Sequence, residues 1–249
     1  MLLLNNFAFF LLRSKAVFNL VLAESALETI PRQLWQLPLI RKYAEKRRKK
    51  AQFLLLDRSY HHAAMKNLAE NEKKGRPDIV HFSLLEALGS PLSKEGLLQV
   101  YVHTMSDYVI SVNRETRLPR NYDRFGGLME QLFELKRIPP EGSPLLTLIE
   151  RMSLCQLAEK IKPDHTVAFS RKGTPKTLEE TISELSEKKN PLAIIGGFPH
   201  GTFSKSTMEL ADQVVSIDRE MLETWTVTAR IVYEYEKIVG IPSKRLAIK

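Results

Sequence analysis

Short apolar runs alternate along this chain with segments whose apolar residues recur every three or four positions. The first pattern is typical of buried strands, and the second of helices packed on one side. The runs predicted as strands are residues 18–23, 53–57, 99–103, 108–112, 165–170, 192–195 and 213–217. Because strand and helix patterns follow one another, the chain is predicted to form an α/β layered domain.

Helical periodicity fills most of the remaining sequence. Between residues 79 and 88 one apolar stripe contains Ile79, Phe82, Leu85 and Leu88, and Asp78 stands where it can cap the first turn. Further helices are predicted for a short segment ending at residue 30 and for residues 41–50, 59–68, 125–135, 145–161 and 221–232. The predicted strands 99–103 and 108–112 are separated by a gap of hairpin length, so we expect them to pair.

Composition and charge narrow the class of partner. The chain has 249 residues, of which 43% are apolar and 27% charged, as is ordinary for a water-soluble protein with one large domain or two small ones. Its formal net charge is +8, which favours a polyanionic partner such as nucleic acid, or an anionic membrane surface. Residues 41–50 contain seven basic residues and one acid, a pattern typical of a solvated helix face or of a polyanion contact.

The first twelve residues are apolar but too few to cross a bilayer. They also lack a basic start and a small-residue cleavage pattern. We interpret them as an extra strand or helix, or as the product of a start site upstream of the functional one.

Cysteine, histidine and tryptophan contribute little predicted chemistry. Cys155 is the single cysteine, so it forms no intramolecular disulfide, which agrees with a reducing cytoplasm; we expect it to be a small buried side chain. None of the six histidines has the spacing of a zinc motif, and no metal site is predicted. We expect His200 to face solvent rather than to touch a ligand, and Trp225 to pack in the core or at a dimer interface rather than to line a ligand pocket.

Four arginines in two proline-containing segments form the strongest local signal. Arg76 lies in the first segment, and Arg117, Arg120 and Arg124 lie in the second. A guanidinium stays charged and offers a planar fork of donors that matches a pair of anionic oxygens. The spacings of three and four place the last three arginines on one face of any helical portion. This cluster predicts phosphate contacts, although a single arginine is more often only a solvated surface charge.

A glycine-dense loop follows the strand predicted at residues 192–195. Its glycines, Gly196, Gly197 and Gly201, let the backbone approach a ligand closely. The loop has neither the dinucleotide fingerprint nor the phosphate-binding P-loop spacing. Since loops at the carboxyl ends of strands are the usual ligand sites of α/β sheets, we expect a ligand here.

Together these segments resemble the small-subunit ribosomal RNA pseudouridine N1-methyltransferases of archaea and eukaryotes, which are trefoil-knotted SPOUT methyltransferases. The resemblance covers residues 18–235 and leaves residues 1–17 as an N-terminal extension. It is carried by residues 22–28, 56–61, 75–81, 90–92, 116–125, 195–199 and 225–227. The two arginine motifs, in this order, are its most specific part.

The resemblance implies one SPOUT domain over residues 18–249, with a C-terminal trefoil knot, helices on both faces of the sheet and a hairpin inserted at about residues 91–118. It also implies S-adenosylmethionine held in the knotted loops. The residues that would hold it are Gly196, Gly201, Val215, Ser216, Ile217, Asp218, Arg219 and Glu220. The charges of the last three depart from a loop that packs against adenosine.

The same resemblance implies roles for the arginines. Arg76, Arg117, Arg120 and Arg124 would bind RNA, and Arg76 braced by Asp78 would act in catalysis. The implied reaction is methyl transfer from S-adenosylmethionine to N1 of a pseudouridine in small-subunit ribosomal RNA during ribosome biogenesis. A cytoplasmic homodimer with its site near the dimer interface, and without a membrane partner, is also implied.

Two other readings stay open at the level of the sequence. A non-catalytic ribosomal RNA-binding assembly factor would use the same arginines with an idle methyltransferase fold. A related SPOUT enzyme acting on uridine or guanosine, for example in transfer RNA, would share the cofactor loops. Cofactor binding separates the first from the enzyme, and substrate choice separates the second.

Overall fold

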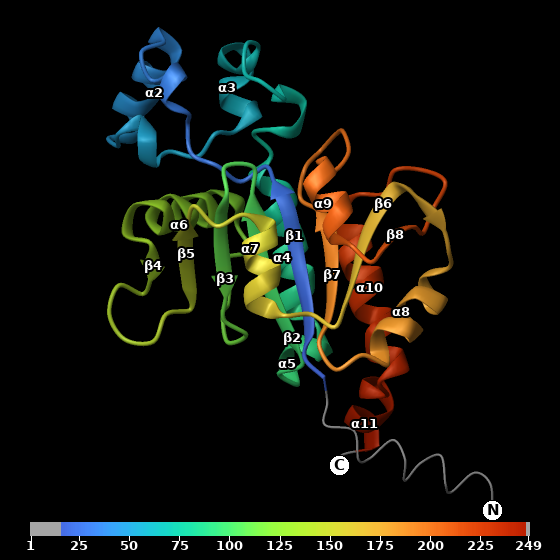
Figure 1. Ribbon diagram of the computed structural model, residues 1–249. Helices are drawn as coiled ribbons and strands as arrows, with labels where there is room; N and C mark the ends of the chain where they lie inside the picture. The colour runs from blue at the N-terminus through green and yellow to red at the C-terminus, as the bar shows by residue number, and fades with distance from the viewer. Residues whose placement is uncertain (1–15, 248–249) are drawn as a thin grey trace, which may run out of the picture.

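One mixed sheet organises residues 16–247, the part of the chain that the computed structural model describes. Its eight strands lie in the order β4-β5-β3-β2-β1-β7-β6-β8 (Figure 1). They are β1 Phe18–Ser25, β2 Leu98–Thr104, β3 Tyr108–Val112, β4 Arg137–Ile138, β5 Leu146–Glu150, β6 His165–Pro175, β7 Pro191–Gly196 and β8 Gln213–Ser216. Pairing is parallel from β2 through β1, β7 and β6 to β8, and antiparallel from β2 through β3 and β5 to β4. The interpretation of residues 1–12 lies outside the described residues.

Helices cover both faces of this sheet (Figure 1). The α-helices of the described residues are α2 Pro38–Arg47, α3 Arg58–Met65, α4 Pro77–Gly89, α5 Pro91–Lys94, α6 Tyr122–Leu135, α7 Leu154–Ile161, α8 Leu178–Ser186, α9 Lys205–Leu210, α10 Thr224–Ile238 and α11 Ile241–Ala247, of which α2 and α3 lie beyond the sheet rather than on a face of it. Side chains alternate along β1: Leu20 and Leu22 join the core formed with α4, α6, α8 and α10, while Val21 and Ala23 join the core closed by α7. A strand buried on both faces reads as a continuous apolar run, and the α/β prediction is therefore confirmed.

An extension between β1 and α4 stands beyond the carboxyl end of β1 (Figure 1). This α2–α3 extension, residues 26–75, also contains the 3₁₀ helices η1 Arg32–Leu34, η2 Ala51–Phe53 and η3 Asn71–Lys73. It has a small core of its own, made of Ile30, Leu34, Ile40, Leu54, Leu56, Met65 and Leu68. The basic segment predicted at residues 41–50 is thus mostly the exposed helix α2.

Three predicted elements are wrong. Residues 53–57 form no strand of the sheet; they follow η2 and make one bridge, Thr29 to Leu55, because they pack inside the extension. Residues 26–30 form no helix, and the Ile30 N–H donates to the Leu54 carbonyl instead. Residues 145–161 are not one helix, since β5 pairs with β3 before α7 begins at a capping box.

The helix stripes were also assigned in part to the wrong side. Phe82 is 42% exposed, whereas Val80, Ser83 and Leu84 face the core with Ile79. Cys155 is exposed, because α7 buries Leu154, Leu157 and Ala158 instead. In both helices short apolar windows fit two faces equally, and the sheet's position selects one.

Among residues 16–247, no helix is long and apolar enough to span a bilayer. The same residues contain no group of three or more histidine, cysteine or carboxylate side chains placed to hold a metal ion.

Candidate active site

A cavity of about 190 Å³ opens at the carboxyl end of β7, beside residues 169–171 of β6. Parallel strands present their carboxyl ends at one edge of the sheet, where loops can converge on a ligand. The wall combines the middle of β6, the end of β7 with the loop after it, the segment after β8 and the start of α10. Its residues are Arg76, Phe169, Ser170, Arg171, Ile195, Gly196, Phe198, Pro199, His200, Gly201, Thr202, Phe203, Ser216, Ile217, Asp218, Glu220, Met221, Leu222, Glu223, Thr224 and Val227.

Two glycines keep the loop after β7 close to its surroundings. Gly201 has φ +100°, a conformation that favours glycine, and a Cβ there would lie 3.1 Å from Cε of Lys73. A Cβ on Gly196 would lie 2.9 Å from the ring of Phe198. A side chain at either position therefore forces a shift of the cavity wall.

The buried carboxylate of Glu24, at the end of β1, holds this loop in place. Its Oε1 accepts from the Ser204 N–H at 2.8 Å and from Oγ1 of Thr207 at 2.8 Å, and its Oε2 accepts from Nζ of Lys73 at 2.9 Å. Burial by itself would raise the pKa of Glu24, but these hydrogen bonds outweigh it and hold the pKa below its ordinary value. The Lys73 ammonium also lies 4.8 Å from the Phe198 ring centroid. One ionic network thus joins the α2–α3 extension to the cavity loop.

The segment after β8 bonds to itself and to the glycine loop. Ser216 Oγ donates to the Asp218 carbonyl at 2.9 Å, and the Glu220 N–H donates to Oδ1 of Asp218 at 3.0 Å. Thr224 Oγ1 donates to the Gly196 carbonyl at 2.8 Å, which fastens the start of α10 to the end of β7. The carboxylate of Asp218 is therefore partly used in shaping the turn, to which Glu220 contributes its backbone N–H.

The cavity brings together six of the eight residues predicted to hold a cofactor. These six are Gly196, Gly201, Ser216, Ile217, Asp218 and Glu220. Val215 instead faces the main core and is buried, and Arg219 is exposed and lies outside the wall. The departure of Val215 follows from β8, whose alternation turns this side chain inward before the loop begins.

Arg76 is the predicted catalytic residue that lines this cavity. It occupies the N-cap of α4, so Asp78 lies in the first turn and binds the guanidinium rather than capping the helix. The Asp78 carboxylate accepts from Nε at 2.9 Å and from Nη2 at 2.8 Å. These bonds are the main reason that the pKa of Arg76 is raised, and the nearby charges of Glu223 and Asp57 raise it further. Two of the five guanidinium N–H groups are used by Asp78, and the others can serve an anionic ligand.

His81 connects the two arginine segments. Its Nε2 lies 2.7 Å from the Pro119 carbonyl, which can only accept, so this nitrogen carries the proton. The ring stacks on Phe125 with centroids 4.2 Å apart. Burial lowers the pKa of His81 and keeps the imidazole neutral. The second arginine segment is therefore held against α4 by a neutral hydrogen bond and a ring stack.

The other three arginines lie outside the cavity. Arg117 and Arg120 precede α6, whose N-cap is Asn121, so the inference of a shared helical face applies to neither of them. Arg117, Arg120 and Arg124 are all exposed. None of them forms an ion pair with a carboxylate of the described residues. Exposed guanidinium groups without an internal carboxylate partner are available to an external anion.

Several wall residues carry no recognisable signal in the sequence. Phe169, Ser170 and Arg171 continue an ordinary strand, and only its position beside β7 brings them to the cavity. His200 is exposed as expected, yet it also lines the cavity. Trp225 is absent from the wall and packs edge-to-face against Phe82 with centroids 5.4 Å apart.

Comparison with known proteins identifies the family. A model of the EMG1/NEP1 methyltransferase family matches residues 20–236. The chain belongs to this family. The predicted family resemblance is therefore confirmed over nearly the range from which it was inferred.

Individual members of the family are similar over almost their whole length. The ribosomal RNA small subunit methyltransferase Nep1 of Staphylothermus marinus is 42% identical over 227 residues, covering 91% of this chain and 98% of that protein. The protein of the same name from Thermococcus onnurineus is 44% identical over 220 residues, covering 88% and 98%. The crystal structure of Archaeoglobus fulgidus Nep1 bound to S-adenosylhomocysteine matches with a TM-score of 0.78 and 38% identity, covering 91% of this chain and 99% of that one.

Proposed function

We propose that this member of the EMG1/NEP1 family transfers the methyl group of S-adenosylmethionine to N1 of a pseudouridine in small-subunit ribosomal RNA. The carrying observation is that Arg76, braced by Asp78, lines the cavity formed by the glycine loop and residues 216–224. Further support comes from relatives named for methylation of small-subunit ribosomal RNA and from the Archaeoglobus fulgidus relative bound to S-adenosylhomocysteine.

The wall suits a nucleoside with a charged amino-acid tail. Ile195, Ile217 and Leu222 offer apolar surface for the faces of adenine, and the carboxylates of Asp218 and Glu220 offer acceptors for an ammonium group. When bound there, S-adenosylmethionine would supply an electrophilic methyl group on a sulfonium sulfur.

Arg76 is then placed to act on the acceptor base. Pseudouridine is a C-glycoside, so its N1 carries a proton, which would pass to solvent as N1 takes the methyl group; the bonding pair of the donor would stay on its sulfur. Negative charge grows on N1 and the adjacent carbonyl oxygen during this exchange. A preorganised guanidinium that accepts this charge stabilises the transition state by ~3–4 kcal/mol. Alignment of the reacting atoms supplies a further ~7–11 kcal/mol.

The exposed arginines of the second segment bind the RNA backbone in this proposal. Arg117, Arg120 and Arg124 lie on the segment that His81 holds against α4, so phosphate contacts there position the base at Arg76. Such contacts orient a nucleic acid without reading its sequence. Small-subunit ribosomal RNA is thus the macromolecular partner.

A homodimer belongs to the same proposal. Phe82 and Trp225 pack together on neighbouring helices α4 and α10, with Phe82 42% exposed, and Tyr233 further along α10 is 59% exposed. Exposed apolar groups of this size on one pair of helices favour a protein interface. Since α4 and α10 both begin at the cavity wall, an interface there would lie beside the active site. We also propose that the loops around residues 195–224 form the trefoil knot, and that the protein works in the cytoplasm.

The direct test is transfer of labelled methyl to two RNA hairpins that differ only in having pseudouridine or uridine at one loop position. We expect label on the pseudouridine hairpin alone. Equal labelling of both would overturn the N1 assignment and favour a related enzyme with another target. Label on neither, with RNA binding intact, would favour the assembly factor.

Cofactor binding gives an independent decision between enzyme and assembly factor. The wild type should bind S-adenosylhomocysteine, and Gly196→Val should lose that binding because the new side chain collides with Phe198. Gly89→Val is the matched control, since a Cβ on Gly89 meets no atom within 4 Å. Isothermal titration calorimetry measures both variants, and a wild type indifferent to the ligand would remove the enzymatic proposal.

A further inference from the structure

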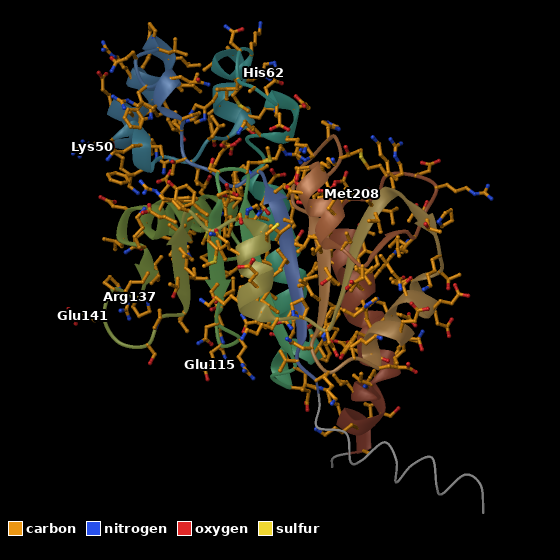
Figure 2. All side chains as sticks on the ribbon, in the orientation of Figure 1. Lys50, His62, Glu115, Arg137, Glu141 and Met208 are labelled. Carbon is orange, nitrogen blue, oxygen red and sulfur yellow. The ribbon has the colours of Figure 1, made fainter. Side chains whose placement is uncertain are left out.

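A second cavity, of about 300 Å³, lies between the α2–α3 extension and α6. Figure 1 shows α6 beneath α2, and Figure 2 shows the side chains that project from the extension, with Lys50 on the side of α6. Its wall consists of Tyr43, Arg47, Leu55, Asp57, Tyr60, Tyr122, Asp123, Gly126 and Glu130. None of these residues belongs to the wall of the cavity beside Arg76.

Aromatic rings form much of this wall. Tyr43 and Tyr60 have ring centroids 5.6 Å apart with their planes tilted by 33°, and Tyr60 is 51% exposed. Tyr122 contributes a third ring from α6. Gly126 adds open space between them, since a Cβ built there meets no atom within 4 Å. A flat ring system is the kind of guest that such walls accept by stacking.

The polar groups at the back of the cavity are already paired. Tyr122 donates its hydroxyl proton to Asp57, and the almost fully buried Glu130 accepts from Arg47 at 2.9 Å and from Lys49 at 3.0 Å. Burial and the adjacent Asp57 carboxylate raise the pKa of Tyr122, so its ring stays neutral. The wall is therefore held in shape without a guest.

Charge separates the inside of the cavity from its surroundings. The wall carries the one cation of Arg47 against the three carboxylates of Asp57, Asp123 and Glu130, which disfavours a phosphate inside. Outside, the exposed cations of the extension and of the start of α6 favour a polyanion. They are Arg41, Lys42, Lys46, Arg48, Lys50, Arg120 and Arg124. These cations repel a basic peptide and attract a phosphate backbone, which favours an RNA chain with one base turned inward.

We propose that this cavity binds an unstacked RNA base whose edge presents amino or imino donors, with guanine the best match. Guanine offers an imino and an amino N–H side by side, which one carboxylate can accept together. Asp123 is the exposed carboxylate of the wall, and in this proposal it accepts both hydrogen bonds from guanine. The inference rests on the proposed function, because it takes RNA as the partner.

The position of the cavity makes the guest a neighbour of the methylated nucleotide. Asp57 lines the second cavity and is also one of the charges, after Asp78 and Glu223, that act on Arg76 in the wall of the first. The two cavities therefore lie close enough for a carboxylate in the wall of one to act on the guanidinium in the wall of the other. A base held in the second cavity would fix which loop nucleotide reaches Arg76.

The test compares two glycines of one helix. Gly126→Leu fills the cavity, whereas Gly127→Leu adds the same side chain to α6 outside the wall, and a Cβ at either position meets no atom within 4 Å. Binding of the full chain is measured, without methyl donor, to RNA hairpins that carry an abasic site at each loop position in turn. For the wild type we expect one position, originally guanine, at which base removal weakens binding roughly 5- to 100-fold. Gly126→Leu should bind that abasic hairpin and its parent equally, while Gly127→Leu should behave as the wild type.

A second pair of variants changes Tyr60 of α3 and leaves α6 unaltered. Tyr60→Leu should reproduce the effect of Gly126→Leu, and Tyr60→Phe should retain base dependence, because stacking needs the ring and not the hydroxyl. A Gly126→Leu chain that keeps the wild-type base dependence would overturn the proposal. So would a uniform loss of affinity across all hairpins, which indicates backbone contacts or an occupant other than a base.

This outcome is separable from that of the proposed function. The binding series uses uridine at the target position and needs no methyl transfer. Failure of pseudouridine methylation with base dependence intact would leave the second cavity assigned, whereas methylation without base dependence would remove only the second cavity.

Discussion

Two acid–base pairs lie where the α2–α3 extension joins α4, and their surroundings differ. Their basic members, Lys73 and Arg76, are three residues apart in the sequence. Lys73 and Glu24 meet at 2.9 Å with side chains only 7% and 8% exposed. Arg76 and Asp78 meet at 2.8 Å with side chains 35% and 27% exposed. Distance therefore does not distinguish the two pairs, but access to solvent does. A buried pair must stay intact because either partner alone is an uncompensated charge, whereas a half-exposed pair can exchange water for a ligand at little cost.

The number of partners separates the pairs in the same way. Glu24 also accepts from Ser204 and Thr207, so its carboxylate organises the start of α9 and the glycine loop. The Arg76 guanidinium is held by Asp78 on one side and keeps N–H groups available on the other. The first pair builds the cavity, and the second is ready to act in it.

Breaking the buried pair should have the largest effect. Glu24→Ala leaves the buried Lys73 ammonium with only the exposed carboxylate of Glu70, 3.7 Å away, and removes the acceptor of Ser204 and Thr207, so we expect the free energy of unfolding to fall by ~3–5 kcal/mol. Asp78→Ala, the matched change in the other pair, should cost under ~1 kcal/mol. Urea denaturation of both variants measures the difference. Similar losses would mean that the two pairs are equivalent in stability.

Breaking the half-exposed pair should mainly affect turnover. Arg76→Ala should lower kcat by ~10²–10³-fold, because a preorganised donor to the developing charge is lost. Asp78→Asn should lower turnover less than Arg76→Ala does, yet more than it lowers affinity for S-adenosylhomocysteine, since the guanidinium stays but loses its brace. Single-turnover methyl transfer and calorimetry give the two quantities. Unchanged turnover in Asp78→Asn would remove Asp78 from the mechanism.

Acid titration sharpens the comparison for two buried carboxylates of the junction. The pKa of Glu24 is lowered, so its stabilisation is complete above the ordinary value of about 4.5 and is lost as pH falls through the folded value. Burial raises the pKa of Glu28, and the Lys74 ammonium only partly offsets this. The contribution of Glu28 to the stability of the fold is therefore complete in acid and is lost as pH rises through the folded pKa. The destabilisation by Glu24→Gln should therefore shrink below pH 4.5, whereas that by Glu28→Gln should be greatest in acid. Unfolding curves of both variants at several pH values measure this difference. The same pH dependence for both variants would contradict the opposite pKa shifts of Glu24 and Glu28.

The smallest effects are expected at the arginines without an internal partner. Alanine at Arg117, Arg120 or Arg124 should each reduce the slope of log affinity for RNA against log salt by ~0.7–0.9, with stability unchanged. Arg114→Ala is the control. This exposed arginine bonds the Gly96 carbonyl and adjoins Glu115, which Figure 2 places at the end of the sheet opposite the extension. A slope change in Arg114→Ala equal to the others would indicate non-specific binding over the whole surface.

Strand predictions were accurate where burial on both faces makes the local signal strong. β1 and β7 appear in the sequence as continuous apolar runs, and both lie in the middle of the sheet. Residues 53–57 have the same local pattern, yet they pack within the extension because no neighbouring strand is available there. Residues 146–150 resemble the start of a helix until the antiparallel partner β3 is known. A short apolar run determines burial, but only its neighbours determine hydrogen bonding.

The sequence by itself determined the family, the layered α/β class and the arginine and glycine motifs, because each of these depends on residues close together in the chain. Only the tertiary structure decided which of those residues share a cavity. It joined Lys73 to Glu24 across 49 positions, moved Arg219 and Val215 out of the wall, and brought Arg171 into it. It also formed the second cavity from the extension and α6, segments separated by two strands of the sheet. Contacts between distant segments depend on how the sheet and helices pack, and no local pattern carries that information.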